Sequence, residues 1–480
     1  MKVRVRKKSE REAAAAGRES PRADQLQGVP SSPGGGHVRV TPARRAAAEI
    51  LRRVEEEGAF ASVLLAHAVE KLGPEDRALS YELTLGVLRW QLWLDWVIEH
   101  YAGRPVATLD APVRRALRLG LYQLRFLTRV PASAAVNESV KLTREANLES
   151  AAAFVNAVLR RATREPDYDP ATRARTKIER ISISTSHPTW LVSRWANAFG
   201  AVEAEALARA NNRTPAVAFR VNALVAGGDD AVIERLRAAG VEAVPSRVAP
   251  GAWRVASGGG EPLRALVSEG LAYTQDEASQ LVGHVVGARA GERVLDACAA
   301  PGSKATQIGV ASRDGAVVVA GDLYRHRLRT VVESAARQGL KGVRPVAFDA
   351  EAARLPFADE SFDRVLIDAP CTGTGTLRHN PEIRWRLALS DIAQLAARQS
   401  RILDNCARTV RRGGRLVYST CSVEPEENEF VVAKFLETHP DFRQTRADAP
   451  AGLLSAKGAA RTWPHRDEAD GFYVAVLERD

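Results

Sequence analysis

Cysteine, methionine and long apolar runs are scarce in this chain of 480 residues, which has four cysteines and one methionine. Because no CxxC pair occurs among Cys298, Cys371, Cys406 and Cys421, the sequence excludes a disulfide framework and gives no indication of a metal site. No run approaches the roughly 18 apolar residues of a membrane-spanning helix. The N-terminus MKVRVRKKSERE lacks the apolar segment of a secretory signal. We therefore expect a cytoplasmic protein with no membrane partner.

The residues that are present indicate a folded, basic protein. Hydrophobic residues make up 45% of the chain and charged residues 26%, which lies in the ordinary globular range. Lys and Arg number 68 against 58 Asp and Glu, giving a net charge of +10. This balance permits an acidic partner such as nucleic acid, but it indicates neither a fold nor an enzyme class. The length predicts about three domains.

Residues 1–37 differ in composition from the rest of the chain. They carry eight Lys and Arg against four acids and end in PSSPGGGH. So little apolar surface cannot compensate for the entropy of ordering, which predicts a disordered basic tail. Two interpretations of the tail stay open: a plain solvated arm, or an accessory arm that contacts RNA.

The pattern then changes twice along the chain. Residues 38–165 show only helical periodicity, beginning at Thr41-Pro42, which has the form of a helix N-cap followed by proline. This predicts an all-helical bundle. Residues 166–270 combine a linker, the helical run HPTWLVSRWANAFG and the strand-like run VAFRVNAL, which favours a small α+β module.

In the last part of the chain, residues 271–480, short apolar runs alternate with helical segments. The runs are ERVLDAC, AVVVAGD, VRPVAFD, DRVLIDAP, RLVYSTC and FYVAVLER. Buried strands that alternate with helices predict an α/β, Rossmann-like domain with a mostly parallel sheet. Ligands of such sheets bind at the carboxyl ends of the strands, so the residues that follow each strand are the candidates for a site.

A small-residue loop and several acids occupy those positions. The loop lies between the first predicted strand and a helix, an arrangement that exposes backbone N–H groups to a ligand. It has neither the GxGxxG nor the GxxxxGK[ST] spacing, so dinucleotide and ATP binding are weakly indicated. The loop consists of Cys298, Ala299, Ala300, Pro301, Gly302, Ser303 and Lys304. Asp322, Asp349 and Asp368 end the next three strands, and Asp322 stands where an acid often binds ribose hydroxyls.

Two cysteines leave the same predicted edge of the sheet. Cys371 lies in DAPCTGTG after the fourth strand, and Cys421 lies in YSTCS after the fifth. A single free cysteine is usually a small buried hydrophobe. Two of them at a ligand-binding edge favour thiol chemistry. Cys406 lies within a helical run and is assigned to packing.

The motifs DACAAPGSK, DAPCTGTG and YSTCSVEPEENE resemble the signatures of the Sun/NOL1/NOP2 family of RNA cytosine-5 methyltransferases. The helical segments LGVLRWQLWLDW, GLYQLRFLTRVPASAAVNE and FVNAVLRR are similar to the NusB fold. The resemblance covers residues 38–480. Ser303 departs from it, because the family usually has glycine there, and the basic tail is extra.

The resemblance implies a division of roles. Cys421 would be the nucleophile that adds to C6 of cytosine, and Cys371 would take part in release. Residues 298–304 would hold the methionine end of S-adenosyl-L-methionine, Asp322 the ribose and Asp349 the adenine side, with Asp368 near cofactor and base. The target cytosine must reach the pocket unpaired or flipped out. Whether Lys304 activates a thiol or is only a structural charge stays open.

The expected function is therefore methylation of C5 of a cytosine in 16S ribosomal RNA, by a monomer acting on free RNA or on a partly assembled small subunit. The NusB-like domain and the small module are expected to contact this RNA. One alternative is the same reaction on transfer RNA or another RNA. A different alternative is a NusB-like RNA-binding factor without activity, against which the intact Cys371, Cys421 and loop 298–304 argue.

Overall fold

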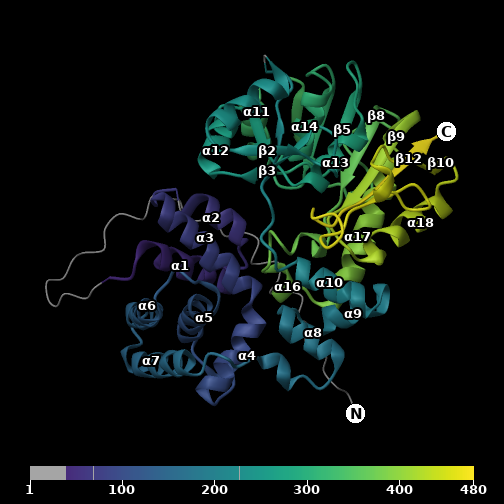
Figure 1. Ribbon diagram of the computed structural model, residues 1–480. Helices are drawn as coiled ribbons and strands as arrows, with labels where there is room; N and C mark the ends of the chain where they lie inside the picture. Colours follow the sequence, from purple (N-terminus) through teal and green to yellow (C-terminus); the bar gives the residue numbers. More distant parts are fainter. Residues whose placement is uncertain (1–38, 69, 226) are drawn as a thin grey trace, which may run out of the picture. The chain divides into compact units, whose positions relative to one another are not determined.

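The computed structural model describes residues 39–68, 70–225 and 227–480 (Figure 1). The predicted basic tail, residues 1–37, lies outside the described residues. Val40–Asp480 form one compact unit. Within the described residues, no helix combines the length and the apolar character that crossing a membrane requires.

The N-terminal part of this unit is the predicted helical bundle. It is built from α1 (Pro42–Glu57), α2 (Ala61–Ala68), α3 (Pro74–Arg89), α4 (Gln91–Ala102), η1 (Val106–Thr108), α5 (Ala111–Phe126), α6 (Ala132–Glu145) and α7 (Glu149–Arg164). Its core includes Leu65, Leu83, Leu94 and Leu117, all of which are fully buried. Helix α1 begins with Pro42 after Thr41 and ends at Gly58, which adopts the left-handed conformation that favours glycine.

Short helices and a small antiparallel sheet follow, as the mixed pattern predicts. The helices are η2 (Pro170–Arg173), α8 (Lys177–Thr185), α9 (Thr189–Phe199), α10 (Ala201–Ala210), α11 (Gly228–Ala238) and α12 (Gly260–Ser268). The strands are β1 (Ala218–Val221), β2 (Glu242–Pro245), β3 (Ala252–Ser257) and β4 (Ala272–Thr274), in the order β2-β3-β1-β4. Phe219 and Leu236 are fully buried in its core.

An eight-stranded, mostly parallel sheet organises the C-terminal part. The strands are β5 (Arg293–Asp296), β6 (Val317–Asp322), β7 (Val343–Ala347), β8 (Phe362–Asp368), β9 (Val410–Thr420), β10 (Phe442–Thr445), β11 (Ala460–Arg461) and β12 (Tyr473–Arg479). Their order is β10-β12-β9-β8-β5-β6-β7, and β11 pairs with β12. The five strands β5 to β9 run parallel, whereas β10, β11 and β12 pair antiparallel.

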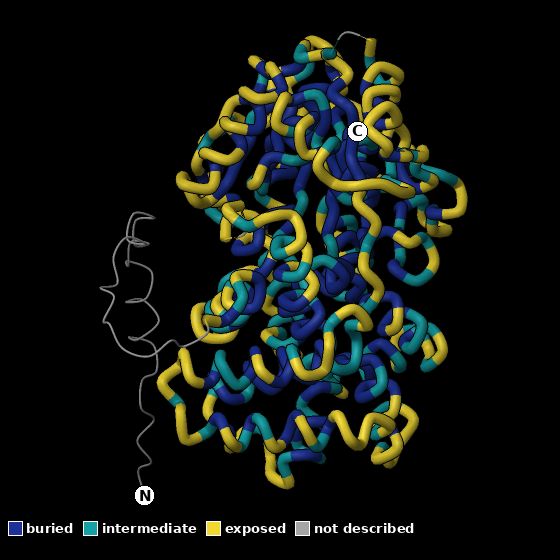
Figure 2. The backbone as a smooth tube through the Cα atoms, turned by 60° about the vertical axis from the view of Figure 1, so that its left-hand side comes forward, coloured by how far each residue is buried: buried dark blue, intermediate teal, exposed yellow. Residues whose placement is uncertain are grey.

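Helices cover both faces of this sheet, which explains the near-continuous apolar character of its strands. On one face, Val294 and Leu366 pack with α13 (Glu277–Val286), α14 (Ser303–Ala311) and α15 (Leu328–Arg337). On the other face, Leu295 and Val365 pack with α17 (Leu389–Ala407) and α18 (Glu429–Thr438). Neighbouring residues of one strand thus pack into opposite cores, and Figure 2 shows buried segments of the backbone in dark blue inside the fold. The predicted fold class is confirmed.

The connections reverse direction between β5 and β8. From β5 the chain proceeds outward to β6 and β7, and then returns to β8 and β9 on the other side of β5. In an open α/β sheet the carboxyl ends of the strands at such a switch point border a ligand-binding crevice. The loops after β5, β8 and β9 therefore border the expected ligand-binding crevice.

Candidate active site

The two thiols lie in contact at this edge. Strands β8 and β9 are parallel neighbours with Asp368 opposite Ser419, so the loops that follow them start side by side. The Sγ atoms of Cys371 and Cys421 are 3.3 Å apart. Both residues are partly buried and free of disulfide bonds, whereas Cys406 belongs to α17 and is wholly buried in the core.

A buried ion pair lies beside the thiols. Lys304 Nζ, from the first turn of α14, donates to Asp368 Oδ2 at 2.7 Å, and Ser419 Oγ donates to Asp368 Oδ1 at 2.8 Å. Burial opposes the charge of Lys304, but the Asp368 carboxylate outweighs it and raises the pKa of Lys304 above its ordinary value. The ammonium group is therefore charged, and Asp368 is its partner.

The loop Cys298–Lys304 turns sharply under backbone constraint. Gly302 has φ of 108°, and a Cβ built there would lie 2.9 Å from the backbone of Val331, so only glycine fits. Ser303 is the first residue of α14 and keeps a negative φ. The departure at Ser303 therefore does not disturb the turn, since no left-handed conformation is needed at that position.

Asp296, at the end of β5, is an acid that the sequence analysis did not count as a site residue. Its side chain is fully buried, and among the described residues neither carboxylate oxygen has a hydrogen-bond donor. Burial, and then the neighbouring charge of Asp368, raise the pKa of Asp296 to about 7. The backbone N–H of Cys298 opposes this rise, but no donor among the described residues meets full hydrogen-bond geometry with the Asp296 carboxylate. The sequence offered one signal for Asp296 as a site residue, namely its position at the end of the strand that precedes the loop Cys298–Lys304.

The other two predicted acids lie in different surroundings. Asp322 is 5% exposed, and its carboxylate accepts a hydrogen bond from Tyr324 N at 2.8 Å and forms an ion pair with Arg327 Nη1 at 3.0 Å. Asp349 is exposed and accepts from Glu351 N at 2.8 Å, as a turn residue does. The structure thus places Asp322 at the carboxyl edge of the sheet and Asp349 in an exposed turn after the neighbouring strand β7.

A cavity of about 590 Å³ opens at Cys371. One wall comes from the short helix α16 (Ile383–Arg386) and from α17, and the other includes Phe60, which precedes α2 of the helical bundle. The ring of Phe60 is 48% exposed, and the Arg386 guanidinium lies 5.6 Å from its centre. Arg386 in turn donates to Gly58 O at 2.8 Å, which fixes the turn that carries Phe60.

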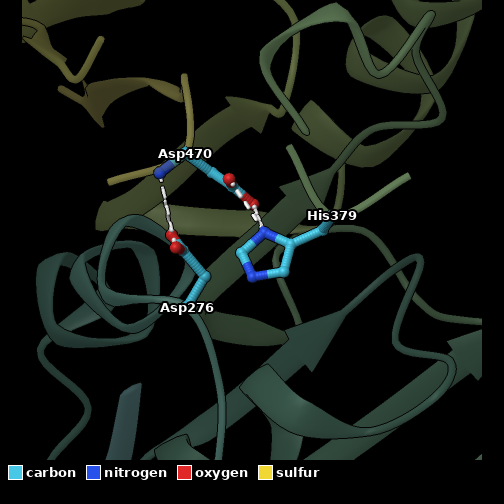
Figure 3. Close-up of side chains that lie close together, drawn as sticks. All are labelled: Asp276, His379 and Asp470. Carbon is cyan, nitrogen blue, oxygen red and sulfur yellow. Dashed lines mark hydrogen bonds and ion pairs between the residues drawn. The ribbon is translucent and has the colours of Figure 1, made fainter. Parts of the chain in front are cut away.

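Asp276, His379 and Asp470 form a cluster with the atom types of a metal site (Figure 3). Its charges are already matched within the chain. His379 Nδ1 lies 2.9 Å from Asp470 Oδ2, Arg378 Nε donates to Asp470 at 3.3 Å, and Asp470 N donates to Asp276 at 3.3 Å. The cluster ties together three segments distant in sequence, and we assign it no metal.

The C-terminal sheet and the groups at its carboxyl edge define a Rossmann-like methyltransferase domain, which is joined to an N-terminal helical bundle. Comparison with known proteins supports both assignments. Residues 284–478 match the model of the 16S rRNA methyltransferase RsmB/F family, residues 41–164 the NusB family, and residues 187–259 the ferredoxin-like domain of RsmF/B-like methyltransferases. The chain belongs to the family of ribosomal RNA small subunit methyltransferase B.

Relatives match over nearly the whole chain. It is 32% identical to a probable ribosomal RNA small subunit methyltransferase B of Bacillus subtilis, over 92% of this chain and 100% of that protein. It is 34% identical to ribosomal RNA small subunit methyltransferase B of Citrobacter koseri, over 90% and 98%. The solved structure of PH0851 superposes with a TM-score of 0.80 at 28% identity, covering 92% of this chain and 100% of that one.

Proposed function

We propose that this protein transfers a methyl group from S-adenosyl-L-methionine to C5 of a cytosine in 16S ribosomal RNA, through a covalent bond between Cys421 and C6 of the base. The observation that carries this proposal is the contact of Cys371 and Cys421, 3.3 Å apart, at the switch-point edge of the sheet. The RNA is inferred from relatives named as small subunit methyltransferases.

The residues at the edge fit this cofactor. S-adenosyl-L-methionine, when bound, supplies a methyl group activated by the positive charge of its sulfonium. The loop Cys298–Lys304 offers a glycine position with no room for a Cβ, and the buried carboxylate of Asp296 lacks a donor that an ammonium group would supply. Asp322 is proposed to bind the ribose hydroxyls and Asp349 the adenine side.

The two thiols divide the work on the base. The Cys421 thiolate adds to C6, which makes C5 nucleophilic towards the methyl group. C5 would then take the methyl group as the bond from that group to the sulfonium sulfur breaks. The C5 proton would pass to a base as the bond between Cys421 Sγ and C6 breaks, which restores aromaticity. Cys371 is in contact with Cys421 and assists the release. Asp368 accepts a hydrogen bond from the cytosine N4 amino group while Lys304 balances its charge.

Cofactor affinity tests the place of Asp322. We expect Asp322→Ala to weaken binding of S-adenosyl-L-methionine by about 1–3 kcal/mol, because the ribose hydroxyls lose a charged acceptor. Isothermal calorimetry on the folded variant measures this, with the exposed Asp359→Ala as the control. An affinity equal to that of the unaltered protein removes Asp322 from the cofactor site.

The cavity at Cys371 is proposed to take the RNA next to the flipped cytosine, with Phe60 stacking on a neighbouring base. Stacking on an aromatic side chain contributes about 1–3 kcal/mol per base. We expect Phe60→Ala to weaken binding of single-stranded RNA about tenfold and to leave cofactor affinity unchanged. Val63→Ala is the matched control, since Val63 is 57% exposed and does not line the cavity. Equal losses in both variants contradict the assignment.

The alternatives are separated by one transfer assay. The protein is incubated with labelled cofactor and either unmodified 16S ribosomal RNA or transfer RNA, and the digested nucleosides are analysed. We expect labelled 5-methylcytidine from the ribosomal RNA. The same product from transfer RNA alone favours the first alternative, and no label in either RNA favours a binding factor without activity.

A further inference from the structure

The buried carboxylate of Glu427 joins the loops that carry the two thiols. Glu427 ends the short helix η4 (Pro425–Glu427), and its side chain is fully buried. Its Oε1 accepts from Thr372 N at 2.9 Å, and its Oε2 accepts from the hydroxyls of Thr372 and Ser422. Thr372 follows Cys371, and Ser422 follows Cys421. One carboxylate therefore binds the neighbour of each thiol.

Further bonds from the same network hold both loops. Gln399 Nε2, on α17, donates to Glu427 Oε1 at 2.9 Å and to Pro370 O at 3.0 Å. Tyr418 OH donates to Glu427 O at 2.6 Å. Gly375 N donates to Cys421 O at 2.9 Å, which links the two loops directly. Four donors converge on the Glu427 side chain, so its oxygens act as acceptors. Burial raises the pKa of the Glu427 carboxyl, and these hydrogen bonds act against that rise.

Charge is distributed unevenly around the thiols. The hydrogen bond with Cys421 and burial, and after them the charges of Cys421 and Glu427, raise the pKa of Cys371 well above its ordinary value. The positive charge of Lys304 interacts with Cys421. Other charged and titratable groups lie around the pair or line the cavity at Cys371: Asp368, Asp296, Tyr418, Glu351, Arg386, Asp391, Arg398 and Arg401. The anion beside Cys371 favours the neutral thiol at that position.

We infer that Glu427 is the positioning residue of the thiol pair: it anchors both cysteine loops in one register and favours the protonated form of Cys371. The Cys371 Sγ–H then donates to Cys421 Sγ across the 3.3 Å contact. This inference rests on the proposed function, in which Cys421 attacks the base.

Alkylation without RNA tests the charge effect separately from methyl transfer. Iodoacetamide modification of each cysteine is followed by mass spectrometry across pH. In the unaltered protein we expect Cys421 to react about tenfold faster than Cys371, because burial and its hydrogen bond keep the Cys371 thiol protonated. In Glu427→Gln the ratio should fall, because the negative charge beside Cys371 is lost. Glu426→Gln, in the same short helix but paired with Arg194 at the surface, should keep the original ratio.

Kinetics test the anchoring. We expect Glu427→Gln to lower kcat about tenfold or more, with KM for RNA unchanged, and to move the acid limb of the pH–rate profile to lower pH. An unchanged alkylation ratio and pH limb overturn the charge effect, even if kcat falls. An unchanged kcat overturns the anchoring. If the unaltered protein shows the alkylation ratio but methylates no RNA, the proposed function fails instead.

A second variant tests the anchoring if Glu427→Gln does not fold. Thr372→Val removes the hydroxyl donor and leaves the carboxylate with its other three donors. We expect it to fold, to keep the alkylation ratio and to lower kcat about threefold to tenfold through the loss of one hydrogen bond. Full activity of this variant contradicts the anchoring of the Cys371 loop by Glu427.

Discussion

We expect Cys421→Ala to abolish methyl transfer to RNA, with a loss on the order of 10⁴-fold or more, as removal of a covalent nucleophile produces in other enzymes. The reason is that C5 of cytosine is a poor nucleophile until a thiolate adds to C6. Alanine leaves the loop backbone intact, including the bond from Gly375 N to Cys421 O. Transfer of a labelled methyl group to 16S ribosomal RNA measures the loss.

Two controls make this result specific to the thiol. Cys406→Ala removes a sulfur of α17 that packs in the core and should leave transfer intact. Cofactor affinity of Cys421→Ala should equal that of the unaltered protein, because the cofactor loop lies after a different strand. Residual transfer above about one tenth of the original rate would contradict Cys421 as the nucleophile.

The second large effect is expected from Cys371→Ala. In this variant we expect the covalent complex with RNA to accumulate, whereas Cys421→Ala forms none. Cys421 can still attack and the methyl group is still transferred, but release is slow without the neighbouring thiol 3.3 Å away. The enzyme should accumulate as a covalent complex with its methylated RNA. A denaturing gel with labelled RNA detects this complex as a band that survives denaturation.

The same gel contains the outcomes that contradict the division of roles. A stable adduct with Cys421→Ala and none with Cys371→Ala would mean that the roles are reversed. If both variants only lose stability and neither forms an adduct, the thiols are packing residues. The double variant should form no adduct, since it has no thiol at either position.

Much of the fold follows from short-range pattern. The six apolar runs became β5, β6, β7, β8, β9 and β12. Interior parallel strands buried on both faces need continuous apolar sequence, whereas β12 pairs antiparallel and β7 lies at the edge. Strand β10 was not predicted, since three of the four residues in its sequence FRQT are polar, as suits an edge strand. The pattern also predicted both cysteine loops at one edge of the sheet, whereas the contact of the two thiols at 3.3 Å comes from the structure.

The remaining parts of the candidate site depend on side-chain pairing that no local pattern carries. The sequence left the role of Lys304 open, and the structure gives it Asp368 as a partner. Glu427 appeared only as one acid in the run VEPEENE, and its hydrogen bonds to the thiol loops required the folded chain. Phe60 reaches the cavity at Cys371 from a distant helical segment. The roles of these residues remain proposals.

The proposed chemistry makes one demand that methyl transfer to a nitrogen or oxygen atom of RNA does not make: C5 must lose its hydrogen. Ribosomal RNA prepared with tritium at C5 of cytosine, incubated with the protein and methyl-labelled cofactor, reports both events in one sample. The account predicts one tritium released to water for each methyl group incorporated, and no release with Cys421→Ala. Methyl incorporation without tritium release would place the methyl group on another atom and contradict the proposed reaction.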